Sequence, residues 1–252
     1  MNKIFRNKKF RNILGIVLLI TVSLATLGAT TPTVDAYNPP HKKPQLDITQ
    51  SMNSDFDSLY KIYSHNKIIP KSLEKQIIYA LSYFPELVDA HIEFRIEKTE
   101  NGIISTRPTI GSAFKSKKNR NYIVFINDTS ADRKIPSFLN GPANGQVGIL
   151  GHELCHVVYY NHRSGLGLVG LAIAYSSRKF VDGFENKTDS MDIERGLGYQ
   201  LIYWVEYLHK GFAAMRGNNA LPPFERKPGR ERYMSVASIL RVMAGSAVYK
   251  NL

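Results

Sequence analysis

The chain has 252 residues, enough for one sizeable domain with its own hydrophobic core, and no second domain is required. Hydrophobic residues make up 43% and aromatic residues 11% of the chain, which excludes a disordered tail. The formal net charge of +12 indicates attraction to anionic partners such as cell-surface polymers or lipid head groups, but the scattered basic residues do not predict a specific nucleic-acid site.

Residues 1–36 have the pattern of a signal peptide. Five basic residues precede the apolar run Ile13 to Ala29, and Val34-Asp35-Ala36 offers a small-residue cleavage site before Tyr37. Cleavage there would leave a mature chain of charge +8, because the removed segment holds those five basic residues and one acidic residue. The alternative is an uncleaved membrane anchor, since 17 apolar residues are at the short limit for crossing a bilayer. Both interpretations predict an exported protein, secreted or held in the cell envelope.

The mature segment begins with residues 37–50, which are polar and contain prolines. This composition predicts a linker, followed by one catalytic domain over residues 51–252. Ser72 can cap a helix whose apolar residues recur at helical spacing and which ends at Pro85.

Two strands are predicted next. Residues 91–98 alternate between apolar and polar side chains, as a half-buried strand does. Residues 121–127 are rich in β-branched and aromatic side chains, and the two segments together suggest an antiparallel pair. Further along, Gly165 to Ala174 is unusually apolar and rich in small residues, but it is too short to span a membrane.

The chemistry is concentrated in GHELCH, residues 151–156, which matches the pattern H-E-x-x-H inside a helix predicted over about 145–160. His152 and His156 lie one turn apart on the same face, so both imidazoles can reach one tetrahedral zinc ion at about 2.0–2.1 Å. Glu153 can reach a water on the metal and take its proton, which makes the water a nucleophile.

Cys155 is the only cysteine, so an exported monomer has no internal disulfide and relies on its core or on a metal ion. On a helix it lies about 100° from its neighbour His156, away from the ligand face. We therefore expect Cys155 to be buried packing.

A third zinc ligand is needed, and Glu185 is the favoured candidate. Glu185 and Asp189 are four residues apart in a second predicted helix and so share one face. Glu185 could bind the metal, while Asp189 could accept a hydrogen bond from the free ring nitrogen of a zinc-binding histidine and fix its tautomer.

With these residues the chain resembles the gluzincin group of zincin metallopeptidases, in which H-E-x-x-H is followed by a helix bearing E-x-x-x-D. The match covers about residues 121–205. The resemblance implies zinc bound by His152, His156 and Glu185, Glu153 as general base, and peptide or protein substrates. It also implies that the strand at residues 121–127 is the edge strand beside the cleft, where an extended substrate would add by main-chain hydrogen bonds.

His162 is an alternative third ligand, because its six-residue spacing from His156 fits the metzincins, H-E-x-x-H-x-x-G-x-x-H. The glycine of that pattern is replaced by Tyr159, which favours a continuing helix. Ten residues beyond His152, His162 would lie about 15 Å along the axis and could share the ion only if the helix broke.

Later residues offer a donor for a developing oxyanion, and Tyr233, Arg195, Tyr199 and His209 are the candidates. Tyr233 has a slight preference, because it would stand on an ordered turn before a final helix over 236–247 that is capped at 235.

The same region predicts a continuous helix. Asp192, Glu194 and Arg195 are expected on its charged faces, a stripe of apolar residues from Leu197 to Leu208 faces the core, and Trp204 is expected to pack.

The fold class that follows is α+β: a small antiparallel or mixed sheet with an edge strand over the active-site helix, and a mainly helical C-terminal half. The predicted function is zinc-dependent hydrolysis, with proteolysis implied by the resemblance. Two other classes stay open: a zinc-stabilised envelope protein that binds without catalysis, and a basic surface-binding protein with a coincidental motif.

Overall fold

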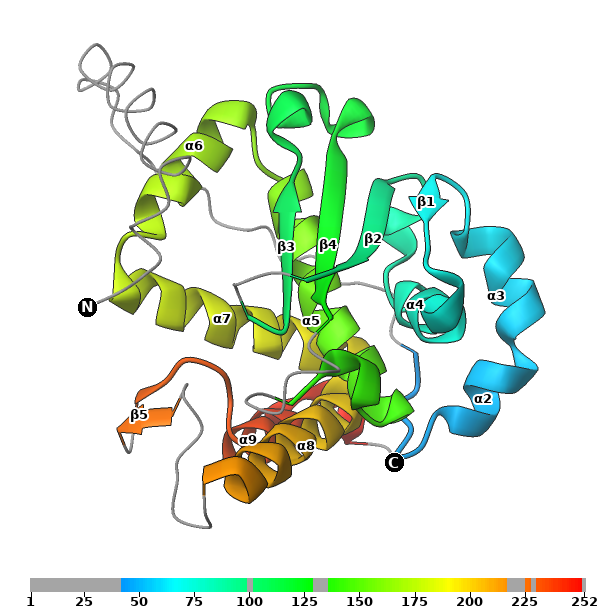
Figure 1. Ribbon diagram of the computed structural model, residues 1–252, viewed down its shortest axis with the longest axis vertical. Helices are drawn as coiled ribbons and strands as arrows, with labels where there is room; N and C mark the ends of the chain where they lie inside the picture. The colour runs from blue at the N-terminus through cyan, green and yellow to red at the C-terminus, as the bar shows by residue number, and fades with distance from the viewer. Residues whose placement is uncertain (1–41, 99–101, 129–135, 217–224, 228–229, 251–252) are drawn as a thin grey trace. The chain divides into compact units, whose positions relative to one another are not determined.

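The computed structural model describes residues 42–98, 102–128, 136–216, 225–227 and 230–250, so the predicted leader and most of the predicted linker lie outside it. The described chain has an α+β fold in which helices predominate (Figure 1). Its helices and strands are α2 Thr49–Ser54, α3 Phe56–Tyr63, β1 Lys67–Ile68, α4 Glu74–Leu81, β2 His91–Glu97, β3 Ile104–Pro108, β4 Asn121–Asn127, α5 Ala143–Asn161, α6 Gly165–Ala174, α7 Arg178–Asp192, α8 Gly198–Arg216, β5 Glu225–Lys227, β6 Arg230–Glu231 and α9 Val236–Gly245.

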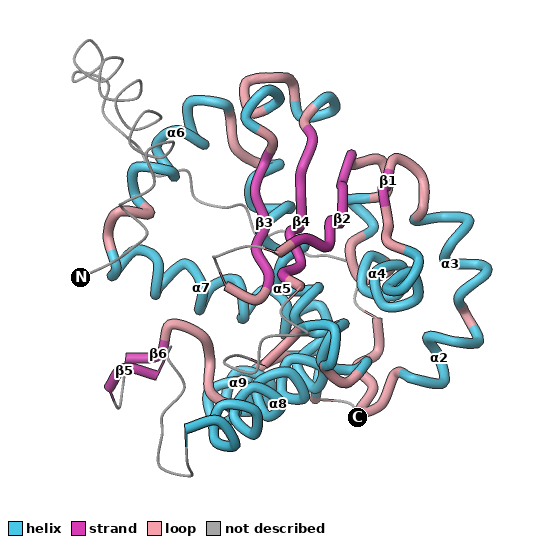
Figure 2. Tube along the Cα trace, in the orientation of Figure 1, coloured by secondary structure: helices cyan, strands magenta, loops and turns pink. Residues whose placement is uncertain are grey.

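The main sheet is mixed, and its strands lie in the order β1-β2-β4-β3 (Figure 2). Strand β2 runs parallel to β1 and to β4, while β3 runs antiparallel to β4. The expected antiparallel pairing of residues 91–98 with 121–127 is therefore wrong, and the mixed sheet is confirmed. The reason is that residues 104–108, which lie between these two segments in the sequence, form the further strand β3. Because β3 runs antiparallel to β4, the chain reverses direction again before it enters β4.

Strand β3 takes the edge position that the sequence analysis gave to residues 121–127. Strand β4 is internal, because it pairs with β2 on one side and β3 on the other. The segment ISTRP of β3 has one large apolar residue and no clear alternation, so periodicity did not reveal it. Pro108, at its end, cannot donate a ladder hydrogen bond and is tolerated at an edge.

Helix α5 joins the sheet to the helical half. Ile92 and Phe94 of β2 are buried together with Val124 of β4 and with Leu154 and Val157 of α5, in one hydrophobic core. Strand β2 is half-buried, as predicted, and α5 also contacts β3 and α8. The helix that carries the candidate ligands is thus held by packing on several sides.

Helices α5 and α8 come into close backbone contact at Gly148. A Cβ at this position would lie 2.4 Å from the carbonyl carbon of Gln200. We expect Gly148→Ala to lower the free energy of unfolding by about 1–3 kcal/mol, because backbone atoms cannot move aside as a flexible side chain can. Urea denaturation measures the change.

The matched control is Gly170→Ala in α6, where a Cβ would meet no atom within 4 Å. Alanine there should be neutral or stabilising by up to about 1 kcal/mol, because glycine is the poorer helix former. Equal effects of the two substitutions would contradict the tight crossing of α5 and α8.

The expected continuous helix after Glu185 is interrupted. Helix α7 ends at Asp192, a π-helical segment spans Ile193–Leu197, and α8 follows. Gly196 has φ of 97°, which favours glycine. Of the three residues expected on charged faces, Glu194 is exposed. The expectation is wrong for Asp192 and Arg195, which are 0% and 2% exposed. Asp192 lies against Gly151 of α5, and Arg195, in the π-helical segment, forms an ion pair with Glu86.

Other expectations about packing are confirmed or refined. Trp204 and Cys155 are buried. The Ser235 side chain accepts a hydrogen bond from the N–H of Ser238 and caps α9, as predicted, although the helix ends at residue 245. The expected capping by Ser72 is wrong, because α4 begins after a 3₁₀ turn and no side chain caps it.

The described end of the predicted linker packs onto the domain. Ile48 is fully buried, and its N–H donates to Asn144 of α5 at 3.0 Å. The carbonyl of Gln45 accepts from Gln200 of α8 at 2.9 Å. Within the ranges that the structure describes, every helix is too short or too polar to cross a membrane.

Candidate metal centre

Helix α5 presents His152 and His156 on one face, as the four-residue spacing predicts. Both side chains are buried, and their Nε2 atoms lie 3.2 Å apart. The rings meet edge to face, with centroids 4.8 Å apart. Two imidazole nitrogens therefore converge on one point.

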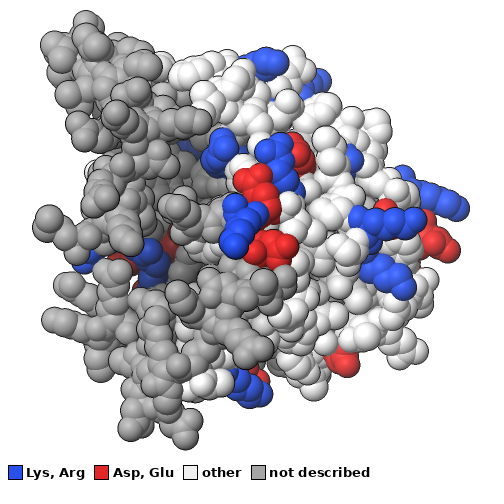
Figure 3. Space-filling view, in the orientation of Figure 1, with Lys and Arg blue, Asp and Glu red and all other residues white. Residues whose placement is uncertain are grey.

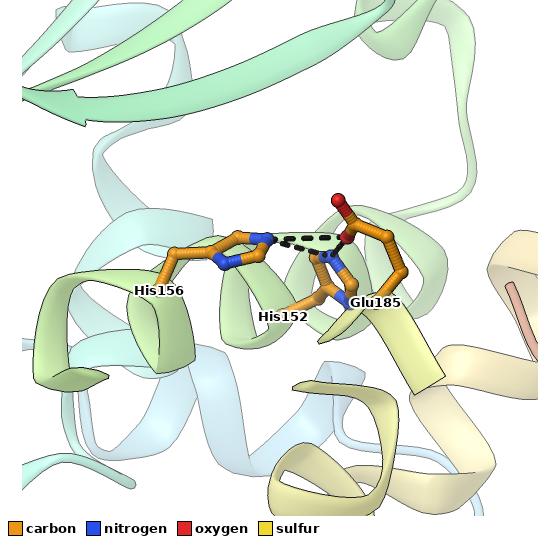
Figure 4. Close-up of side chains that lie close together, drawn as sticks. All are labelled: His152, His156 and Glu185. Atoms are coloured by element: carbon orange, nitrogen blue, oxygen red, sulfur yellow. Dashed lines mark hydrogen bonds and ion pairs between the residues drawn. The ribbon is translucent and has the colours of Figure 1, made fainter. Parts of the chain in front are cut away.

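Helix α7 brings a carboxylate to the same point (Figure 4). Oε2 of Glu185 lies 3.1 Å from Nε2 of His152 and 3.3 Å from Nε2 of His156. Glu185 is itself buried. Residues 33 positions apart in the sequence are thus brought together by the packing of α7 against α5.

These three residues form a buried group that could hold a metal ion. A tetrahedral ion with bonds of about 2.0–2.1 Å separates its ligand atoms by about 3.3 Å. The observed separations of 3.1, 3.2 and 3.3 Å fit that arrangement. The residues present therefore match the donor set and the spacing that such an ion requires.

Asp189 lies behind His152, on the side away from the converging atoms. Its Oδ1 is 2.7 Å from Nδ1 of His152, and its Oδ2 accepts a hydrogen bond from the N–H of Met234 at 2.7 Å. The contact with the histidine is the one that the E-x-x-x-D spacing suggested. The contact with Met234, on the turn before α9, could not be read from that spacing.

The contact between Nδ1 and Asp189 fixes what the other nitrogen of His152 can do. A neutral imidazole that donates from Nδ1 has a lone pair at Nε2. That lone pair faces the carboxylate of Glu185 at 3.1 Å, so the pair requires a proton or a cation between the two atoms.

The electrostatics of the metal-free site are consistent with a proton there. Burial lowers the pKa of His152, but hydrogen bonds to Asp189 and Glu185 outweigh it and raise the pKa well above the usual value. Burial raises the pKa of Glu185, but hydrogen bonds from the two histidines outweigh it and lower the pKa. The carboxylate is therefore ionised, and the imidazole of His152 is the group that carries the exchangeable proton.

Glu153 is buried one position after His152. Its Oε2 makes no hydrogen bond to the residues that the structure describes. Its charge contributes to raising the pKa of Tyr160 and of Tyr233, which places the carboxylate near both rings. A buried, unpartnered carboxylate oxygen beside the ligand cluster is what a proton acceptor in this place requires.

Tyr233 is the oxyanion donor candidate that lies at the site. Its ring centroid is 5.8 Å from that of His152. Burial, together with the charges of Glu185 and Glu153, raises the pKa of Tyr233 well above its usual value, so the hydroxyl stays protonated. The hydrogen bond from the next residue to Asp189 holds this turn against the cluster.

The other candidates lie elsewhere. His162 is exposed at the C-terminal cap of α5 and is outside the ligand group. Arg195 forms an ion pair with Glu86 and donates to the carbonyl of Tyr83. Tyr199 packs against Tyr249, 5.8 Å between centroids, in a second hydrophobic cluster. His209 is half-buried on α8 and is likewise not among the grouped ligands.

Sequence reasoning missed three residues around the cluster. Tyr160 stacks on the ring of His156, and the ring of Phe184 packs against the same imidazole, with centroids 5.1 Å apart. The four-residue spacing of Tyr160 from His156 could have revealed the first contact. Asp192 is fully buried against Gly151, where a Cβ would lie 2.2 Å from its Oδ1, and burial raises the pKa of Asp192 well above the usual value.

Comparisons with protein-family models, with curated proteins and with solved structures found no significant match. What the site can do is therefore inferred from its residues and their geometry.

Proposed function

We propose that the protein is a zinc-dependent hydrolase that cleaves peptide bonds, with a gluzincin-like site. The observation that carries the proposal is the convergence of His152, His156 and Glu185 within 3.3 Å of one another. Next to His152, the buried Oε2 of Glu153 has no hydrogen-bond partner among the described residues. Two imidazoles and one carboxylate suit zinc better than magnesium or calcium, which prefer oxygen ligands.

Three protein ligands favour catalysis over a structural role. Structural zinc sites are usually closed by four protein ligands, whereas catalytic sites keep a position open. Among the described residues the group has three members. A bound zinc ion supplies Lewis-acid chemistry, acidifying water and polarising a carbonyl oxygen.

The residues of the chain supply the remaining parts of the reaction. Glu153 takes a proton from the attacking water and can pass it to the leaving amine. Asp189 holds His152 in the tautomer that turns Nε2 toward the metal position. The Tyr233 hydroxyl, kept protonated, donates to the oxygen that becomes negative.

The edge strand β3 supports a peptide as substrate. It lies next to α5, and one of its sides is paired with β4. An extended peptide can add to such an edge by main-chain hydrogen bonds. The edge function that the resemblance implied for residues 121–127 is therefore assigned to β3.

The test is zinc content joined to peptide cleavage. The exported protein should contain about one zinc per chain by mass spectrometry and should cleave members of a broad peptide library. A chelator should abolish cleavage, and added zinc should restore it. Protein that lacks zinc and cannot regain it at neutral pH would end the proposal. Zinc-loaded protein that cleaves no peptide would favour the alternative of a zinc-stabilised envelope protein that binds without catalysis.

Zinc uptake should also depend on pH in a defined direction. Because the pKa of His152 is raised, the metal-free protein holds a proton on this ring below that pKa, and zinc must displace it. Affinity should fall as the pH is lowered, by about tenfold per pH unit below the His152 pKa. Calorimetry in two buffers of different ionisation enthalpy should show about one proton released per zinc at neutral pH.

The stability of the protein without bound zinc should depend on pH in the direction opposite to its zinc affinity. Because the pKa of His152 is raised in the folded state, the protonated ring stabilises the fold at low pH, and this contribution is lost as the pH rises through the folded-state pKa of His152.

The variant Asp189→Asn tests the assigned proton, because it loses the charge that raises this pKa. The number of protons released per zinc bound at neutral pH should decrease. Equal release by Asp189→Asn and the unmodified protein would contradict the assigned proton.

A further inference from the structure

Helix α6 has an apolar outer face, which is unusual for a helix at a protein surface. Its sequence, GLGLVGLAIA, contains no polar side chain. Leu168 and Leu171 face the core, while Leu166 and Ile173 are 66% and 42% exposed. A surface helix usually places polar residues outward, so α6 presents apolar side chains to its surroundings on the face opposite the core.

A loop continues this apolar surface. Ile110 and Phe114, between β3 and β4, are 68% and 71% exposed. The loop lies against the start of α6, because a Cβ at Gly165 would lie 2.9 Å from the ring of Phe114. The buried guanidinium of Arg120 ties the two segments together by donating to the carbonyls of Lys115 and Arg163. We call the exposed residues 110, 114, 166 and 173 the apolar patch.

The two segments that form the apolar patch carry charges of one sign. Residues 102–127 and 154–181 contain no aspartate or glutamate. The loop carries the exposed Lys115, Lys117 and Lys118, and α6 is followed by the exposed Arg178 and Lys179. At the top edge of the face shown in Figure 3, where this loop lies, the surface is white and blue.

We propose that the apolar patch and its basic rim bind the surface of an anionic lipid bilayer. Apolar side chains that enter the headgroup region, flanked by lysine and arginine, are the combination by which proteins lie on membranes. Each basic residue near an anionic surface adds to the attraction. A protein partner would also cover the patch, but a surface free of acidic residues over both segments fits a uniformly anionic sheet best. The proposal is independent of the zinc chemistry.

The test uses a fluorophore whose emission shifts to the blue when it leaves water. The full chain has one cysteine, Cys155, which is fully buried, so Leu166→Cys adds a single reactive site. Ser58→Cys is the control, on the exposed surface of α3, across the sheet from α6 in Figure 1. With vesicles of phosphatidylglycerol and phosphatidylcholine, the label at position 166 should shift to the blue and the label at position 58 should not.

The basic rim is tested by charge reversal. Lys117→Glu/Lys118→Glu should weaken sedimentation with these vesicles on the order of tenfold or more, and added salt should weaken it further. Lys61→Glu/Lys210→Glu makes the same change in net charge on α3 and α8 and should have little effect. Equal weakening by the two double variants would show that only net charge matters and would overturn the proposal.

Other occupants of the patch give different results, and each overturns the proposal. Vesicle binding with the label at position 166 still in water would mean that another segment, such as the apolar run at residues 13–29, binds the membrane. A blue shift that grows with protein concentration without vesicles would indicate a second copy of the chain. The same shift with soluble polyphosphate would indicate an anionic polymer instead of lipid.

Discussion

Replacing Glu153 with glutamine should lower peptide turnover by about 10²–10⁴-fold while the protein keeps its zinc. Glutamine has nearly the same shape and leaves His152, His156 and Glu185 in place. Its amide cannot accept the proton of the attacking water, so the nucleophile stays weak at neutral pH. Steady-state cleavage of a library-derived peptide measures the loss, with zinc content and melting temperature measured on the same sample.

The control for Glu153→Gln is Glu206→Gln, which removes one carboxylate from the exposed surface of α8. Its turnover should stay close to that of the unmodified protein. A loss much smaller than tenfold at position 153 would implicate another base. If Glu153→Gln instead released zinc or unfolded the domain, Glu153 would be structural and the assignment of roles would be wrong.

Replacing Glu185 with alanine should weaken zinc binding by more than about 100-fold, whereas His162→Ala should leave it nearly unchanged. Removing a residue that only orients a ligand typically lowers metal affinity by about 10–100-fold, so removing a direct ligand should lower it further. Glu185 lies within 3.3 Å of both histidine nitrogens, while His162 is exposed at the end of α5. Competition with a chromogenic zinc chelator measures both affinities.

Asp189→Asn provides an intermediate point in this series. It keeps an oxygen near Nδ1 of His152 but removes the charge, so zinc affinity should fall by about 10–100-fold, between the effects of the other two variants.

The control for Glu185→Ala is Glu185→Gln, which separates loss of the ligand charge from the cavity that alanine leaves in a buried position. If His162→Ala weakened zinc more than Glu185→Ala did, a metzincin-like arrangement would be supported and the present ligand set would be refuted.

The sequence by itself determined which side chains could meet within one helix. His152 and His156 are four residues apart, and so are Glu185 and Asp189, because 3.6 residues per turn place such pairs on one face whatever surrounds the helix. Burial of Cys155 and of Trp204 also followed from the sequence, since apolar side chains leave water in almost any fold. The coarse fold class, α+β with a mainly helical C-terminal half, followed from the alternation of strand and helix patterns.

Only the tertiary structure decided how these elements meet. The parallel sense of β2 and β4 and the edge position of β3 depend on pairing between segments distant in the sequence, which local periodicity does not encode. The inward turn of Arg195 depends on the break at Gly196, where a Cβ would lie 2.8 Å from the carbonyl oxygen of Lys42. The meeting of Glu185 with the two histidines depends on the packing of α7 against α5, because side chains on separate helices are brought together by core packing and not by spacing along either helix.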